Sequence, residues 1–364
     1  MQDHGSSPWL MIFQQVISYL LYCLKLRKRN PFLPAFRKSF VYLSSLRAGL
    51  GIVSVVFWIS SSAQLTDNAS TFRNINRKSY FRFHYDNDYF TKTDEYYSQG
   101  LTLEYVHPAF KYFPLSRLLL KARNSDPRYG ISLNHIAYTP TSIRSDTILG
   151  SDRPFAACIS FKTFLASSDS VGEQRISSAV SIGVIGPAAF GREIQTGIHR
   201  WLKNVLPKGW QYQVHNDVLV NYQVNYEKKL LSAGRTFIVN GTAEARVGTL
   251  DDKLGGGFNF MVGNFNDPYH NMPVNKKKLQ YYLFGQGRLS LIGYDATMQG
   301  GVFNKRSPYT ISSGNISRVT FQADAGIIVN FKKLFLSYTQ SYLTKEFNTG
   351  HYHRWGGISA GYAF

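Results

Sequence analysis

A glutamine and a histidine stand four residues apart, at Gln195 and His199, in a segment that the sequence predicts to be a helix. Residues at this spacing share one side of a helix, so the amide and the imidazole can act on the same group. A histidine that titrates near neutral pH can serve as a general base in hydrolysis. The alternative is that the helix only caps one end of the sheet structure and that His199 is a packing residue.

The predicted helix follows a turn at Gly186-Pro187 and is expected to end at Pro207 and Gly209. Its apolar residues recur at helical spacing, at Phe190, Ile194, Ile198, Trp201, Leu202 and Val205. We expect this apolar stripe to dock the helix against the rest of the molecule, which fixes His199 beside it. The rest of the chain after the leader is predicted to be β-strand, so a lone helix carrying Gln and His needs an explanation.

A second polar group lies where the first two predicted strands meet. In Tyr80–Asp88 aromatic residues alternate with Arg, His and Asp, and the next strand starts near Ser98. The alternation places Asp88 and Ser98 on the inward phase of two antiparallel strands, near one rim. Oxygens of Asn87 and Asp88 are hard ligands that suit Ca²⁺. The alternative is that Asp-Asn-Asp forms only a turn.

Two other patterns are set aside. Gly357–Gly361 matches G-x-S-x-G around Ser359, but that elbow needs a sharp turn from strand to helix. Here the chain ends three residues later within a strand pattern, so we attribute the match to coincidence. His351 and His353 stand two apart without a third ligand nearby, which is more typical of solvated surface than of a metal site.

Long alternating segments predict the fold class. Tyr and Phe are abundant, at 24 and 26 residues, while the mature chain has no continuous apolar run long enough for a spanning helix. Apolar and polar residues alternate in Val214–Glu227, Thr236–Gly248 and Ser317–Phe331. Strands of soluble sandwiches average about five or six residues, so runs of this length favour membrane spans. The sequence therefore predicts an all-β chain, a transmembrane antiparallel β-barrel.

About twelve such strands are expected, an even number that suits a single-chain barrel. Their predicted starts lie near Tyr80, Ser98, Arg128, Pro154, Arg175, Gln211, Arg235, Leu254, Leu279, Ser317, Leu334 and His353. The last strand alternates up to a terminal Phe364, a pattern that resembles the C-terminal strand of bacterial outer-membrane barrels.

The N-terminal residues resemble a targeting region. An apolar core and small residues at positions 47–63 predict a secretory signal cleaved after Ala63, with residues 64–364 left as a single barrel domain. Residues 1–36 are long for a leader, and we interpret them as a start site placed upstream of the real one. The alternative is a membrane-interacting leader formed by Leu10–Leu24.

Charge narrows the class of partner. The whole chain carries a net charge of +19, and residues 64–364 keep 34 basic and 21 acidic residues, or +13. A basic surface favours an anionic partner, and an exported chain makes nucleic acid improbable, which leaves anionic lipid or phosphorylated glycan. Cys158 is the one cysteine after position 63, so no internal disulfide is expected.

Taken together, these motifs resemble one family. The matching features are DND before an aromatic at 86–90, TDxxYSxG at 93–100 and GVIGPxxxGxExQxxxHR at 183–200, with a Trp ten residues on and then QVxND. Asp152-Arg153-Pro154-Phe155 adds a DR-aromatic turn. The chain resembles, over essentially all of its mature length, the outer-membrane lipid A 3′-O-deacylases, the LpxR family.

The resemblance implies a twelve-stranded barrel whose active site lies at the outer leaflet, between the wall and the helix. It implies Ca²⁺-dependent hydrolysis of the ester that holds the 3′-linked acyloxyacyl group of lipid A, in a chain expected to be monomeric. Asn87, Asp88, Ser98 and His199 fall on the family's site positions. Gln195, one helical turn before His199, is expected to hydrogen-bond the imidazole or the substrate.

Two positions depart from the family pattern. The loop at 139–147 offers Arg144 where the family has a lysine, and Arg144 could bind a phosphate of lipid A bidentately. The family's acidic residue six beyond the histidine falls on Val205, with Asp217 and Glu193 as candidate replacements. Because of these departures, the chain could instead be a phospholipase-like or inactive relative of the family. The polar inward faces of the strands are also compatible with a passive porin.

Overall fold

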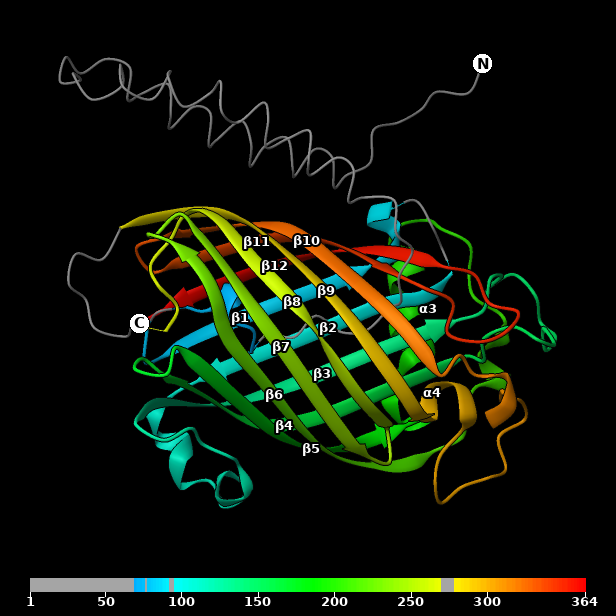
Figure 1. Cartoon of the computed structure of the whole chain (residues 1–364). Helices are drawn as coiled ribbons and strands as arrows, with labels where there is room; N and C mark the ends of the chain where they lie inside the picture. The colour runs from blue at the N-terminus through cyan, green and yellow to red at the C-terminus, as the bar shows by residue number, and fades with distance from the viewer. Residues whose placement is uncertain (1–68, 76, 92–94, 270–277) are drawn as a thin grey trace, which may run out of the picture. The chain divides into compact units, whose positions relative to one another are not determined.

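The computed structural model describes residues 69–75, 77–91, 95–269 and 278–364. Within them twelve antiparallel strands form a closed barrel, in which each strand pairs with its sequence neighbours and β1 pairs with β12 (Figure 1). The strands are β1 Tyr80–Asn87, β2 Tyr96–Val106, β3 Ser125–Thr139, β4 Ala156–Asp169, β5 Gln174–Ile185, β6 Asp217–Ala233, β7 Phe237–Gly248, β8 Asp251–Asn264, β9 Leu279–Asp295, β10 Val319–Phe331, β11 Leu334–Leu343 and β12 His353–Ala363. The predicted leader, residues 1–63, lies outside the described residues.

The barrel confirms the predicted fold class, and most strands start within a few residues of the expected positions. The largest departure is β6, which starts at Asp217 rather than at Gln211. Gly209–Tyr212 forms a 3₁₀ turn (η8) instead, because Trp210 is buried among side chains on the outside of the wall. None of the helices in the described ranges has the length and apolar character needed to cross a membrane.

Alternation along the strands separates an apolar outside from a polar inside. The outward side chains of Val218, Leu254 and Leu289 are 51%, 59% and 52% exposed. The inward side chains of Glu244 and Asp324 are buried. An exposed apolar band around a polar interior is the arrangement that a lipid bilayer requires of a β-barrel. The predicted assignment of the two faces is therefore confirmed for these strands.

Charges inside the barrel are paired across strands. Glu244 of β7 lies 2.6 Å from Arg246 Nε, 3.3 Å from Lys253 Nζ and 2.6 Å from Arg288 Nη1. Because a buried charge is costly unless it is paired, one carboxylate shared by three cations is a stable way to fill a polar interior. The interior is therefore polar and is crossed by ion pairs.

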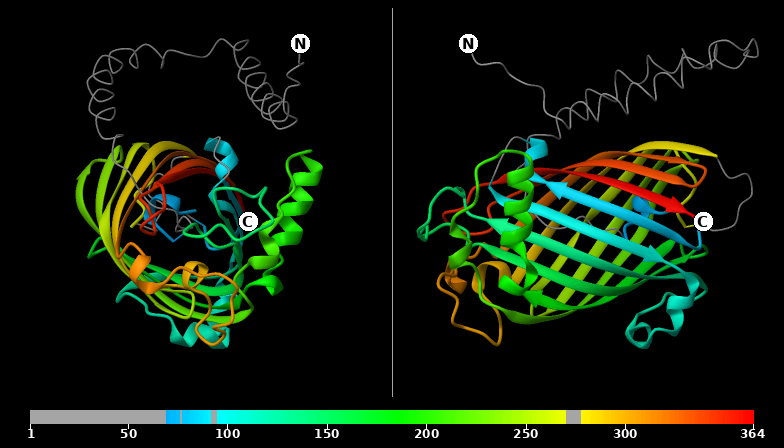
Figure 2. Two further views of the ribbon diagram at one scale, coloured as in Figure 1. Left: turned by 90° about the vertical axis from the view of Figure 1, so that its right-hand side faces the viewer. Right: turned by 180° about the vertical axis from the view of Figure 1, so that it is seen from behind.

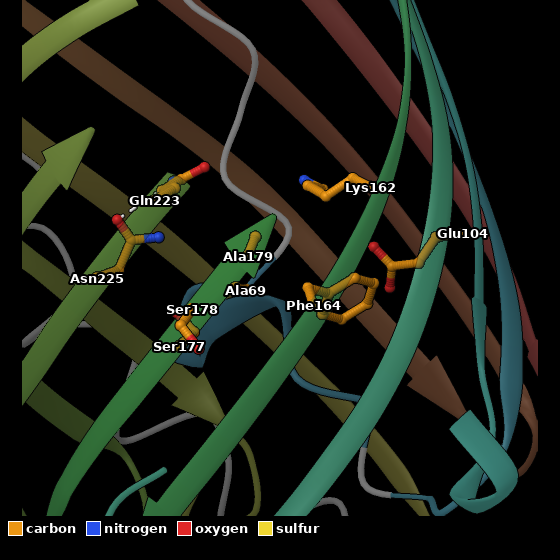
Figure 3. A pocket seen from close by; sticks show the side chains of 9 residues that line it. All are labelled: Ala69, Glu104, Lys162, Phe164, Ser177, Ser178, Ala179, Gln223 and Asn225. Carbon is orange, nitrogen blue, oxygen red and sulfur yellow. Dashed lines mark hydrogen bonds between the residues drawn. The ribbon is translucent and has the colours of Figure 1, made fainter. Parts of the chain in front are cut away.

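A short segment before β1 closes the interior further. The turn Thr71–Arg73 (η3) is fully buried inside the barrel. Each of its residues has a partner on the wall. The Thr71 N–H donates to the Glu227 carboxylate at 3.1 Å, and the Phe72 ring stacks on Phe284 with centroids 4.3 Å apart. Arg73 Nη2 donates to Thr339 Oγ1 at 2.9 Å. These partners come from β6, β9 and β11. One cavity, of about 20 Å³, lies where Glu104 and Lys162 face the interior (Figure 3), and another, of about 320 Å³, lies toward the short-turn end, where Arg77, Asn330 and Lys333 line it.

The two ends of the barrel differ. The turns 170–173, 234–236 and 332–333 lie at one end with both termini of the strand series, while the long connections 140–155, 186–216 and 296–318 lie at the other. The helices α3 (Gly191–Trp201) and α4 (Ala296–Gln299) belong to these long connections (Figure 1). In outer-membrane barrels short turns face the periplasm and longer loops face the outside.

We expect the purified chain to form no stable ion channel in planar bilayers, because η3 and the ion-paired side chains fill the interior. Single-channel recording against a general porin in the same lipid and buffer measures this directly. A steady conductance from the intact chain would revive the porin interpretation.

Candidate functional site at the outer wall

Helix α3 lies outside the barrel wall, at the end with the long connections (Figure 2). A β-carbon on Gly191 would lie 2.4 Å from Ala157 Cβ of β4, so only glycine permits this close approach. Just before the helix, the carbonyl of Ala189 accepts a hydrogen bond from His135 Nε2 of β3 at 3.0 Å. These two contacts fix the start of α3 on the wall.

The face of α3 that packs inward is the polar one. Gly191, Gln195 and His199, spaced four apart, are its buried residues. Phe190 and Trp201 of the apolar stripe are 57% and 63% exposed. The expectation that the apolar stripe docks the helix is therefore wrong. The reason is the surroundings, because a helix outside a membrane barrel meets lipid on its outer side and the wall on its inner side.

The helix also ends earlier than expected, at Trp201 rather than at Pro207. Lys203 takes the left-handed conformation with φ of 55°. Its N–H donates to Arg200 O at 3.2 Å, and the Asn204 N–H donates to His199 O at 2.8 Å. This pair of bonds is a Schellman motif, which reverses the chain at the end of the helix. The reversal brings the next residue back beside His199.

The carbonyl of that residue, Val205, lies 2.5 Å from His199 Nδ1. A carbonyl can only accept, so Nδ1 carries the hydrogen and Nε2 keeps its lone pair. The imidazole is buried, with 8% of its surface exposed. His199 is thus held in the tautomer that can take a proton at Nε2. The family pattern has an acidic residue at position 205. In this chain Val205 orients the histidine through its main-chain carbonyl instead.

Gln195 is fixed by a neighbouring indole. Its Oε1 accepts from Trp210 Nε1 at 2.7 Å, and the Trp210 ring packs on Phe155 with centroids 5.0 Å apart. The indole is a donor, so the amide orientation is determined and Nε2 points the other way. Gln195 Nε2 is buried and has no hydrogen-bond partner among the described residues. A buried N–H donor of this kind is suited to a substrate oxygen.

Asn87 and Ser98 are joined, but not in the way that simple alternation predicted. Asn87 Nδ2 donates to Ser98 O at 2.6 Å, and Ser98 Oγ lies 2.7 Å from Thr139 Oγ1. The register shifts between Tyr97 and Gln99, which makes Ser98 the extra residue of a β-bulge. The bulge turns Ser98 to the outer side of the wall, so its expected inward phase is wrong.

The proposed metal ligands supply oxygens but not a complete cage. Asp88 begins the 3₁₀ turn η4 (Asp88–Thr91) and is buried, and Asn87 precedes it. In the described residues no group of three or more His, Cys, Asp or Glu side chains is placed to hold a metal ion. Ca²⁺ takes about six to eight oxygens, including main-chain carbonyls and water. The carboxylate and amide fit part of such a shell.

A row of paired residues across the outer wall connects the Asn87–Ser98 pair with helix α3, which carries Gln195 and His199. Asn87 is paired with Gln99, Gln99 with Ala137, and Ala137 with Ala157, on which Gly191 of α3 packs. At a strand spacing of about 4.8 Å, this row spans roughly 15 Å. No hydrogen bond within the described residues joins His199 to Ser98. The structure thus joins Asn87 to Ser98 and places Gln195 and His199 on the buried face of α3. No hydrogen bond within the described residues joins Gln195 to the imidazole, because Gln195 bonds Trp210 and His199 bonds Val205.

Arg144 lies on the loop 140–155 with its side chain exposed. The preceding residue, Ile143, is buried and its carbonyl accepts from Lys208 N at 2.9 Å, which docks the loop beside the segment after α3. Arg144 is therefore near that segment but outside the buried group.

Neither candidate acidic replacement reaches His199. Asp217 accepts from the N–H groups of Phe303 and Asn304, at 2.7 and 2.9 Å, and so holds the loop 296–318. Glu193 is exposed on α3. The Val205 carbonyl, not a carboxylate, orients the imidazole.

The DR-aromatic turn ties the long connections together. The guanidinium of Arg153 pairs with Glu346 in the connection 344–352 and donates to Thr297 of α4 at 2.7 Å. It also lies over the Tyr138 ring, 4.0 Å from the centroid. Burial raises the pKa of Glu346 to about 7, although the charge of Arg153 opposes that shift. Phe155, two residues on, contacts Trp210, so the same turn supports the helix site.

His135 is a site residue that our sequence analysis did not single out. It lies on β3 in the outward phase with Leu133, yet it is buried because α3 covers it. Its Nε2 bonds Ala189 O, and its Nδ1 is buried without a hydrogen-bond partner in the described residues. A histidine in the lipid-facing phase of a strand was the signal that could have marked it.

The histidines and serine that we set aside lie elsewhere. Ser359 lies within β12, 3% exposed in the barrel interior, with its Oγ 2.6 Å from His84 Nδ1 and 3.5 Å from Arg73 Nη1. The strand stays regular around Ser359, so no nucleophile elbow forms. His353 is buried against Tyr96 and Trp355 rather than solvated, so that expectation is wrong, while His351 is exposed.

Comparison with known proteins gives two informative matches. A model of the family described as outer membrane protein LpxR matches residues 52–364. The solved structure of LpxR from Salmonella typhimurium superposes with a TM-score of 0.65 at 20% identity, covering 79% of this chain and 100% of that one. The translocator domain of the autotransporter NalP from Neisseria meningitidis reaches a TM-score of 0.44 at 11% identity, covering 89% and 99%. No curated protein sequence matches the chain.

The family match extends over most of the chain, and the similar structure shares the closed barrel. The chain therefore belongs to the LpxR family and is a β-barrel of the bacterial outer membrane.

Proposed function

We propose that the chain is a Ca²⁺-dependent outer-membrane esterase that removes the 3′-linked acyloxyacyl group of lipid A. The observation that carries this proposal is the fixed imidazole of His199. Its Nδ1 donates to Val205 O and its Nε2 is left as a proton acceptor, on the buried face of a helix that lies on the lipid-facing side of the barrel. A lipid substrate in the outer leaflet meets this side of the protein, and not the filled interior.

In the proposed reaction His199 Nε2 takes a proton from a water molecule whose oxygen attacks the ester carbonyl carbon. The bond between that carbon and the sugar oxygen then breaks, and the same proton is returned to the leaving oxygen. Gln195 Nε2 donates to the carbonyl oxygen as negative charge develops on it. Ser98 is held by Thr139 and makes no hydrogen bond to His199 within the described residues, so water is the preferred nucleophile.

Asn87 and Asp88 are the residues that would hold a Ca²⁺ ion, which when bound supplies Lewis-acid polarisation of the ester carbonyl. Arg144, whose side chain is exposed on the loop 140–155, would pair with a phosphate of lipid A. We further propose that one copy of the chain is sufficient for activity, because both polar groups lie on a single barrel wall.

We expect His199→Asn to lower deacylation at least about a hundredfold, because a general base contributes roughly 10²- to 10⁴-fold in rate. Gln195→Ala should cost less, about five- to tenfold, since it removes single hydrogen bonds. Turnover is read by mass spectrometry on lipid A and, in parallel, on phosphatidylethanolamine, whose hydrolysis would favour the phospholipase alternative.

Gly197→Ala is the matched control for these variants. Gly197 lies on the same helix and a β-carbon there would meet nothing within 4 Å, so activity should be unchanged. All variants should keep the heat-modifiable gel mobility of a folded barrel. Near-normal turnover by folded His199→Asn would show that the histidine is structural.

We also expect chelation with EDTA to abolish hydrolysis and added Ca²⁺ to restore it, with Mg²⁺ less effective because it demands a stricter octahedron. Asp88→Ala should raise the Ca²⁺ concentration needed for half-maximal rate. Full activity in excess EDTA would contradict the metal assignment and point instead to a covalent route through Ser98.

A further inference from the structure

The connection between β2 and β3, residues 107–124, is long for the end of the barrel at which it lies. Three of the other connections at that end, 170–173, 234–236 and 332–333, are tight turns, while 265–278 is also long. This connection instead contains the 3₁₀ turns η5 (Pro108–Tyr112) and η6 (Pro114–Leu118), and it projects on the outside of the barrel (Figure 1 and Figure 2). Connections at this end of outer-membrane barrels are usually short, so the length of the connection 107–124 needs a physical reason.

The second half of the connection is fastened to the outer wall. Its bonds are from the Tyr222 hydroxyl to Leu118 O at 2.7 Å, from Ser178 Oγ to Leu120 O at 3.1 Å, and from Ala122 N to Ser167 Oγ at 2.9 Å. Leu119 is buried between them against Leu165 and Val180. The connection therefore covers polar serines that would otherwise face lipid, and it is a fixed part of the outer surface.

The side of this segment that faces away from the wall is apolar. Tyr112, Leu118 and Leu120 are 76%, 58% and 51% exposed. Phe113 contacts Phe161 of β4, with ring centroids 6.1 Å apart, and Phe161 belongs to the outward band of the barrel. The exposed surface of the connection is thus continuous with the lipid-facing surface of the wall.

The charged side chains of residues 107–124 are all basic. Lys111, Arg117, Lys121 and Arg123 are all exposed, and residues 107–124 contain no Asp or Glu. Apolar side chains mixed with Lys and Arg are typical of segments that lie in the plane of a membrane surface, where long basic side chains reach the phosphates.

We propose that residues 107–124 form an in-plane anchor that binds anionic phospholipid in the leaflet at the short-turn end, the periplasmic leaflet. Tyr112, Leu118 and Leu120 lie among the upper acyl chains, and the four basic side chains contact the phosphates. This anchor is independent of the His199 group, which lies at the other end of the barrel.

The first test measures depth in the bilayer. A fluorophore is attached at Leu118→Cys in the full chain that also carries Cys23→Ser, reconstituted in liposomes; the other native cysteine, Cys158, is buried and inaccessible to the reagent. Phospholipid carrying a nitroxide high on its acyl chain should quench this label strongly. The matched control is Val171→Cys, at the tip of a tight turn at the same end and 88% exposed, which should be quenched by aqueous iodide instead.

The second test measures charge selectivity. Native mass spectrometry from mixed micelles should show phosphatidylglycerol retained over phosphatidylcholine by the unmodified chain. The triple variant R117Q/K121Q/R123Q should weaken that retention at least about tenfold, since three charges are removed. The control K305Q/R306Q/K345Q removes three exposed charges at the opposite end and should leave retention unchanged.

Two results would overturn the proposal. One is equal retention of phosphatidylglycerol by the two triple variants. The other is aqueous quenching of the label at position 118 together with photocrosslinking of that position to a periplasmic protein, which would assign the surface to a protein partner.

Discussion

The hydrocarbon of a bilayer contains no water, so every outward position of the barrel must be apolar or covered by protein. Most outward positions are apolar, as at Val218 and Leu254. Three polar exceptions are informative, because each lies under an added element. His135 is buried beneath the start of α3, and Ser167 and Ser178 are bonded by the connection 107–124. At these three positions, polar side chains on the outside of the barrel are buried because the chain folds back over its own wall.

The interior of the barrel, in contrast, is polar. Many of its side chains are charged, and ion pairs such as that of Glu244 with Arg288 stabilise them. The turn Thr71–Arg73 is also buried inside the barrel. Since these groups obstruct the interior, we expect a lipid substrate to reach the protein sideways, through the membrane plane. That route leads to the wall and to α3, where His199 and Gln195 lie.

The alternation of apolar and polar residues predicted most of the fold, because a period of two along a long strand is easy to recognise and many of the turns are short. It failed at Ser98, where one extra residue of a β-bulge reverses the phase, and no residue type announces a bulge. Amphipathic spacing predicted α3, but it could not tell which face meets the wall. A stripe such as Phe190 and Trp201 looks the same whether protein or lipid covers it. The main-chain acceptor at Val205 was also beyond prediction, since a carbonyl is present at every residue.

That carbonyl has a consequence for how the site can change over generations. A carboxylate that orients a histidine is lost by one codon change, whereas an amide oxygen survives any replacement of the Val205 side chain. The orientation of His199 depends instead on the length and path of the reversal through Lys203 and Asn204. The site is therefore tolerant of drift at position 205 and intolerant of an insertion or deletion between 200 and 205. Related chains should vary in residue type across this turn while keeping its length constant.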